Sequence, residues 1–170
     1  MQMQENSSLL ENTDAIWRPD VTVATIVPRD GRFLIVEERV RGELVLNQPA
    51  GHLEPEETLA DAARRETAEE TGWSVEIEHV VGIYQWSNAE GEHFIRFTFA
   101  ARALQHDPLQ PLDDGIVRAI WLTRDEIASG RVRPRSPMVL RGIDDWLGGQ
   151  RLPLAAVQSL AGMVPSGAWT

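Results

Sequence analysis

Three glutamates on the apolar side of one predicted helix constrain this chain more than any other feature. Residues 55–72 read PEETLADAARRETAEETG; they begin with proline and acids, are rich in helix-forming residues and stop at a glycine. At about 100° per residue, Glu66, Glu69 and Glu70 continue the stripe that starts at Leu59 and includes two alanines. A helix that packs through this stripe turns three carboxylates toward its neighbours, whereas the competing interpretation is an ordinary Glu-rich surface helix.

Carboxylates turned toward a protein interior lose hydration and repel one another. The usual remedies are raised pKa values, basic partners or a bound cation. An all-oxygen ligand set favours Mg²⁺, with Mn²⁺ as the alternative, over zinc, which prefers Cys and His. The chain contains no Cys, and this excludes a thiolate zinc site and a cysteine nucleophile. The sequence therefore predicts a magnesium site on the helix.

Composition limits the partners of the chain. A formal charge of -10 without a basic cluster argues against a nucleic acid polymer, so a phosphate-rich ligand needs a cation as mediator. No stretch approaches the roughly 20 apolar residues of a membrane span. The first residues carry neither a basic segment nor an apolar one of the signal-peptide kind. We expect a cytoplasmic protein that is a monomer or a weak dimer.

The pattern of segments predicts an α/β fold with a mixed sheet between helices. We expect an N-terminal extension at 1–18, a single domain at 19–163 and a C-terminal tail at 164–170. Apolar and β-branched runs predict the strands, of which the first two would pair as a hairpin across PRDG. Thr123 is the expected N-cap of a short helix. The predicted strands are 21–27, 32–39, 73–87, 92–104 and 113–123, and the predicted helices are 55–72, 123–130, 136–149 and 152–163.

The helix and the loop before it carry a pattern of fixed residues. They read G-x5-E-x7-R-E-x2-E-E-x-G, with residues Gly51, Glu57, Arg65, Glu66, Glu69, Glu70 and Gly72 at the fixed positions. This pattern resembles the Nudix box and matches every Gly, Glu and Arg of it. It departs only at two apolar positions, where Thr67 and Trp73 stand. Segments such as NQPAGHLE, FIRFTFA and RSP extend the resemblance over about residues 20–160, toward the NudJ-type subgroup of Nudix phosphatases.

The resemblance implies an α/β/α sandwich and a metal-dependent hydrolase of phosphate anhydrides. Glu66, Glu69 and Glu70 would hold the metal and activate water, with Glu69 either a ligand or the base. Gly51 would offer its carbonyl to the metal. Arg65 would also be a catalytic residue and would brace the loop by pairing with Glu57. The alternative is that Glu57 and Arg65 are two exposed charges without a pairing role. Gly72 would end the helix.

The sequence indicates the substrate-binding residues less specifically than the metal ligands. Gln48 and His52 flank the box glycine and could touch phosphate, or serve only the loop. Arg96 could receive a phosphate from its strand, where a solvent-facing arginine is the common alternative. Gln85 could line a ring-binding wall with Trp86, for which core packing is the simpler interpretation. Loop acids that could add a ligand are Asp113, Asp114, Glu90 and Glu92.

The predicted activity is release of phosphate from nucleoside tri- and diphosphates, and from hydroxymethylpyrimidine pyrophosphate. Two alternatives stay open. A Nudix pyrophosphohydrolase for other nucleoside-diphosphate derivatives would share the box and differ in its pocket. A non-catalytic nucleotide-sensing domain would share the fold, but it would not require the intact set Arg65, Glu66, Glu69 and Glu70.

Overall fold

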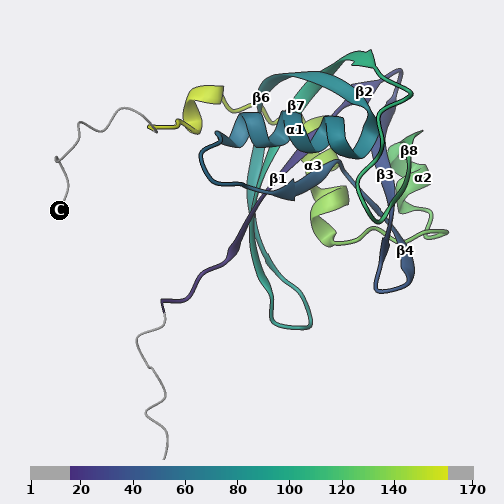
Figure 1. Ribbon diagram of the computed structural model, residues 1–170, viewed down its shortest axis with the longest axis horizontal. Coiled ribbons are helices and arrows are strands. Elements are labelled where there is room, and N and C mark those ends of the chain that lie inside the picture. Colours follow the sequence, from purple (N-terminus) through teal and green to yellow (C-terminus); the bar gives the residue numbers. More distant parts are fainter. Residues whose placement is uncertain (1–15, 161–170) are drawn as a thin grey trace, which may run out of the picture.

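The computed structural model describes residues 16–160, which form two four-stranded sheets and three α-helices (Figure 1). The first sheet has the order β5-β1-β7-β6. Its central pair, β1 and β7, is parallel, and the outer pairs are antiparallel, so the sheet is mixed. Its strands are β1 (Asp20–Ile26), β5 (Ala50–His52), β6 (Trp73–Ser87) and β7 (His93–His106).

The second sheet is entirely antiparallel. Its order is β2-β3-β4, with β8 paired to the other edge of β3. The loop from β4 to β5 passes from this sheet to the first, and the site described below lies near that crossing. Its strands are β2 (Pro28–Arg29), β3 (Arg32–Val40), β4 (Glu43–Asn47) and β8 (Ile116–Leu122).

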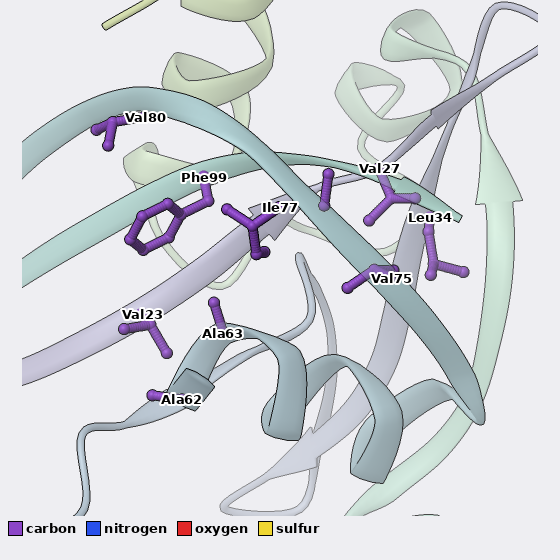
Figure 2. Packing of buried hydrophobic residues seen from close by; sticks show 10 residues of the cluster. Val23, Val27, Leu34, Ala62, Ala63, Val75, Ile77, Val80 and Phe99 are labelled. Carbon is purple, nitrogen blue, oxygen red and sulfur yellow. The ribbon is translucent and has the colours of Figure 1, made fainter. Parts of the chain in front are cut away.

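The two longer helices cover opposite faces of the first sheet. Alternate side chains of a strand point to opposite faces. Val23 and Phe99 accordingly pack with Ala62 and Ala63 of α1 (Leu59–Thr71), as Figure 2 shows. Ile26 on the other face packs with α3 (Pro137–Leu147), and the short helix α2 (Arg124–Ala128) adds Ile127 to that second cluster. The predicted α/β/α class is confirmed.

The predicted hairpin of strands 21–27 and 32–39 is wrong. β1 pairs with β5 and β7, and only the two-residue β2 forms a hairpin with β3. The reason is burial: residues 22–26 of β1 are buried with side chains on both faces, as in a central strand covered by helices. A solvent-facing hairpin strand would alternate instead.

Two predicted helix boundaries also differ. α1 starts at Leu59 rather than at 55, because Thr58 is its N-cap, with a side-chain oxygen that accepts from the backbone N–H of Asp61. Of the predicted helix 152–163, only the 3-10 turn at Leu154–Ala156 forms, because Leu152 instead bridges to Val80 of β6. Residues 161–163 lie outside the described part of the chain.

The strands β4 and β5 were not predicted, whereas other predicted features agree with the structure. β6 and β7 pair antiparallel and extend below the body in Figure 1. Thr123 caps α2 with a complete capping box. No helix between residues 16 and 160 has the length and apolar character to cross a membrane. Most of the expected extension (1–15) and the whole tail (164–170) lie outside the described residues.

We expect Gly72→Ala to destabilise the fold by about 2–3 kcal/mol. Gly72 ends α1 at φ 70°, and an added Cβ would lie 2.6 Å from the Asp107 carbonyl oxygen. Gly31→Ala is the matched control, because its φ is 74° and its Cβ would meet nothing within 4 Å. The control should lose about 1 kcal/mol, the cost of the left-handed conformation alone. Urea unfolding measures both, and equal losses would contradict the steric role of Gly72.

Candidate active site

α1 delivers its acids to the junction of the two sheets. It is fixed at its start by Thr58 and at its end by Gly72, and its small residues allow close approach to the first sheet. As a result Glu66 and Glu70 are buried, at 8% and 7% exposure. Glu69, one turn from Arg65, is half-buried. The sequence correctly placed these acids on the packed side of the helix.

Arg65 ties the helix to the loop that precedes it. Its Nε and Nη2 donate to the two carboxylate oxygens of Glu57 at 3.1 and 2.8 Å, so the pairing that the resemblance implied is present and is bidentate. Its Nη2 also donates to the His52 carbonyl oxygen at 3.1 Å. Its Nη1 donates to Glu66 at 2.7 Å and to Glu69 at 3.1 Å. One guanidinium thus orients two acids of the site, and its hydrogen bond with Glu57 is the largest cause of a raised Arg65 pKa.

Three carboxylates converge beside Arg65. Oxygens of Glu66, Glu69 and Asp113 lie within 4.8 Å of one another. Asp113 comes from the loop before β8, and its backbone N–H donates to the Glu69 carbonyl oxygen at 3.2 Å. The sequence marked Asp113 only as one of four loop acids, because nothing local indicates that this loop folds back onto α1. Asp114, Glu90 and Glu92 are exposed and do not join the group.

Glu70 occupies a separate, more enclosed position. One of its oxygens accepts the backbone N–H of Ala50 at 2.8 Å. Burial raises the Glu70 pKa to about 8; the Ala50 hydrogen bond opposes this shift, and the charges of Glu38, Glu66 and Asp113 add to it. Burial also raises the pKa of Glu66, against the effect of its Arg65 hydrogen bond. Burial therefore makes the charged forms of Glu66 and Glu70 costly in the protein without a bound cation.

Gly51 leaves space that the Glu66 carboxylate fills. A Cβ at position 51 would overlap that carboxylate, so only glycine permits the present approach of β5 to α1. The donor set of carboxylates, with backbone carbonyls nearby, is the all-oxygen kind that Mg²⁺ and Mn²⁺ take. The residues present thus fit a hard divalent cation.

The expected substrate contacts do not converge. Arg96 is buried and pairs in register with Thr22 of β1 and Tyr84 of β6, which places these three on one face of the sheet. Gln85 is one residue further along β6 and exposed, so it faces away from Arg96. A ring-binding role for Gln85 beside Trp86 stays a prediction, on the face of β6 opposite to Arg96.

The two residues that flank the box glycine differ in role. Gln48 is 2% exposed and donates from Nε2 to the Val139 carbonyl oxygen at 2.7 Å, so its amide anchors α3 rather than facing a ligand. The His52 side chain is exposed, and only its carbonyl joins the Arg65 network. Trp86 stacks on Phe94 of the paired strand, with ring centroids 5.6 Å apart, and belongs to neither core cluster.

Sequence reasoning missed polar residues on the side of the site remote from α1. Glu38 of β3 is 7% exposed and pairs with Arg135 at 2.6 Å, and Ser136 beside it is 6% exposed. The one local signal was a pair of acids, Glu37 and Glu38, inside an otherwise apolar strand. Glu37 points the other way, where Arg118 holds it with two hydrogen bonds.

Comparison with known proteins agrees with this geometry. The profile of the NUDIX domain family matches residues 17–142. Phosphatase NudJ of Escherichia coli K12 is 42% identical over 142 residues, which cover 84% of this chain and 92% of that protein. A NUDIX hydrolase structure from Nitrosomonas europaea superposes with a TM-score of 0.83 at 45% identity, over 85% of this chain and 99% of that one. The NUDIX domain of Shewanella oneidensis NrtR, complexed with ADP ribose, shares the fold at a TM-score of 0.63 and 15% identity, over 81% and 92% of the two chains.

The chain belongs to the Nudix family, and its relationship to the NudJ phosphatases makes it a Nudix hydrolase close to them. It is accordingly an enzyme that hydrolyses phosphate anhydrides. Enzymes of this family generally use divalent metals, and the acidic group of Glu66, Glu69 and Asp113 agrees with that requirement.

We expect Glu70→Gln to stabilise the metal-free protein at high pH. The folded pKa of about 8 lies above the ordinary 4.5, so the folded state retains a proton that the unfolded state releases. Stability therefore falls as pH rises from about 4.5 to about 8. Glutamine keeps an acceptor for the Ala50 N–H without the buried charge, and should gain about 2 kcal/mol at pH 9 and little at pH 4.

Urea unfolding in EDTA at both pH values measures this gain. Glu54→Gln is the matched control, since the Glu54 side chain is 63% exposed and its 3.9 Å ion pair with Arg65 is screened by solvent. A Glu70→Gln gain that is the same at both pH values, or no larger than that of the control, would contradict the assigned burial cost.

Proposed function

We propose that this enzyme hydrolyses the terminal anhydride bond of nucleoside tri- and diphosphates, and of pyrimidine pyrophosphates such as hydroxymethylpyrimidine pyrophosphate, with Mg²⁺ and release of phosphate. The observation that carries the proposal is the convergence of Glu66, Glu69 and Asp113 beside the buried Glu70. The identity to NudJ phosphatases over most of both chains supports the substrate class. Mn²⁺ is an alternative cation of the same ligand preference.

Glu66, Glu69, Glu70 and the Gly51 carbonyl would hold the cation, with Asp113 as an added acid. A divalent cation there supplies charge neutralisation for the phosphates and lowers the pKa of a water molecule. Glu69 is the acid best placed to accept a proton, because its side chain is 38% exposed against 11% for Glu66. Arg65 is a positioning residue: it orients Glu66 and Glu69 while Glu57 fixes its own guanidinium.

Arg96 would bind substrate phosphate from the other side of Glu70. Burial lowers the Arg96 pKa to about 10. The charges of Glu38 and Glu70 oppose this lowering, so these acids lie near enough to act on Arg96. An arginine donates to phosphate through a planar fork of N–H groups. His52, exposed at the end of β5, would contact the substrate outside this enclosed region.

The wider organisation of the protein follows the same proposal. A single Nudix domain would span 19–163, between an extension at 1–18 and a tail at 164–170. Its partner would be a small phosphorylated molecule, without a nucleic acid polymer or a membrane. A monomer or weak dimer in the cytoplasm would suit such a substrate.

The product tests the proposal directly. We expect inorganic phosphate, rather than pyrophosphate, from GTP, GDP and hydroxymethylpyrimidine pyrophosphate with Mg²⁺, and little turnover of ADP-ribose or diadenosine tetraphosphate. Glu70→Gln should lower kcat by at least about 100-fold, because it removes a charged group from the reacting centre. Glu54→Gln should leave kcat unchanged.

Two other outcomes of this assay would favour the alternative functions. Turnover of ADP-ribose or the dinucleotide alone would move the protein to the pyrophosphohydrolases. Tight nucleotide binding without turnover of any substrate would favour a sensing domain, the role open to a Nudix fold without hydrolysis.

A further inference from the structure

A buried polar cluster lies between the two sheets, beneath the N-terminus of α3. Arg96, Glu38, Asn47 and Ser136 are each at most 7% exposed. They come from β7, β3, the end of β4 and the residue before α3. The roles of the metal-holding acids do not account for this convergence.

Arg96 is a buried cation on which the charges of Glu38 and Glu70 act only from beyond ion-pair distance. Within residues 16–160 its guanidinium forms no ion pair, and its contacts are long: Nε to Thr22 Oγ1 at 3.5 Å and Nη1 to Asn47 Oδ1 at 3.4 Å. A buried charge is normally held by short hydrogen bonds or a paired ion. The guanidinium therefore has donors available for an anion.

Ser136 has a hydroxyl that the protein leaves unused. It is the N-cap of the 11-residue α3, yet its side chain makes no capping hydrogen bond, and its buried Oγ has no partner within the described chain. A serine in this position ordinarily accepts from a backbone N–H of the first turn. An anion at the helix N-terminus would use the hydroxyl as a donor and gain from the helix dipole.

Pairing with β4 holds this helix end against Arg96. The Arg135 N–H donates to the Leu46 carbonyl oxygen at 2.8 Å, one residue from Asn47. The side chain of Arg135 then reaches Glu38, and its charge is near enough to lower the Arg96 pKa. Because the Arg135 side chain is 45% exposed, the cluster opens to solvent on its side.

Glu38 adds an acceptor to this mainly cationic cluster. Its Oε2 binds Arg135, whereas its buried Oε1 has no partner within residues 16–160. A carboxylate oxygen repels a fully ionised anion but accepts a hydrogen bond from a protonated one. A terminal phosphate, with a second pKa of about 6, can carry that proton. A phosphate esterified on both sides cannot.

We propose that Arg96, Arg135 and Ser136 bind the terminal, unesterified phosphate of the substrate, and that Glu38 accepts a hydrogen bond from its P–OH group. This pocket deepens the proposed function and rests on it for the identity of the substrate. Because a phosphate esterified on both sides carries no proton for Glu38, the cluster selects tri- and diphosphate ends over molecules such as ADP-ribose.

Inorganic phosphate alone tests the pocket without turnover. Calorimetric titration at pH 7 and constant ionic strength, in EDTA, should show phosphate binding at least about tenfold tighter than sulfate, which carries no proton at this pH. Ser136→Ala should weaken phosphate binding about tenfold without loss of thermal stability, since no capping bond is removed. Arg135→Gln should weaken it at least as much.

The matched control is Arg133→Gln, two residues away, which removes an exposed arginine that is paired with Glu43. It should leave phosphate binding unchanged. Glu38→Gln should bring the affinities for phosphate and sulfate together, because an amide can donate to either. Equal binding of the two anions by the unmodified protein, or equal effects at positions 133 and 135, would overturn the proposal.

Different results would reject the proposed phosphate pocket and the proposed activity. Phosphate binding that depends on Ser136 in a protein that hydrolyses none of the substrates would retain the pocket and reject the activity. Hydrolysis of GDP by a protein whose phosphate affinity is unaffected by Ser136→Ala and Arg135→Gln would retain the activity and reject the pocket.

Discussion

The guanidinium of Arg65 is the interaction on which the rest of the site depends. It joins Glu57 and the His52 carbonyl in the loop before α1 to Glu66 and Glu69 on the helix. The hydrogen bonds to the loop fix the guanidinium, and the fixed guanidinium in turn limits the rotamers of the two acids. Because like charges at such separations repel strongly when water is excluded, the site needs this cation to keep its shape before any ligand arrives.

The site also requires a buried place where acidic and basic side chains lie close together, and the fold provides it. β1 and β5 belong to the first sheet and β3 and β4 to the second, and the loop from β4 to β5 crosses between them. α1 brings acids to this junction from one face of the first sheet, whereas Arg96 approaches on the face that α3 covers. Negative and positive groups therefore lie on two sides of Glu70, an arrangement suited to a metal and a phosphate in contact.

Local patterns predicted much of this molecule. The cap at Thr123, the stop at Gly72 and the long antiparallel pair β6 and β7 were readable because each depends on neighbours in the sequence. The side of α1 that carries its acids followed from helix periodicity alone. The Arg65–Glu57 pair required the resemblance to a known box, since seven residues lie between the two and Glu57 precedes the helix.

Non-local contacts were not predictable in the same way. The parallel pairing of β1 with β7 joins segments more than 70 residues apart, and it displaced the hairpin that local sequence favoured. Asp113 looks like an ordinary loop acid, and Ser136 like the first residue of an ordinary helix, until the chain folds back on itself. Gln48 reads as a loop residue beside the box, yet tertiary contact with Val139 makes it part of the packing of α3.

The central claim is that the fold buries acids which a divalent cation then neutralises. Thermal unfolding of the unmodified protein, Glu66→Gln and Asp114→Asn, each in EDTA and in saturating Mg²⁺, measures this most directly. We predict that Mg²⁺ stabilises the unmodified protein and the exposed-site variant Asp114→Asn by about 2–3 kcal/mol at 100 times the dissociation constant, and Glu66→Gln far less. Equal stabilisation of all three proteins, or none in the unmodified one, would contradict the account.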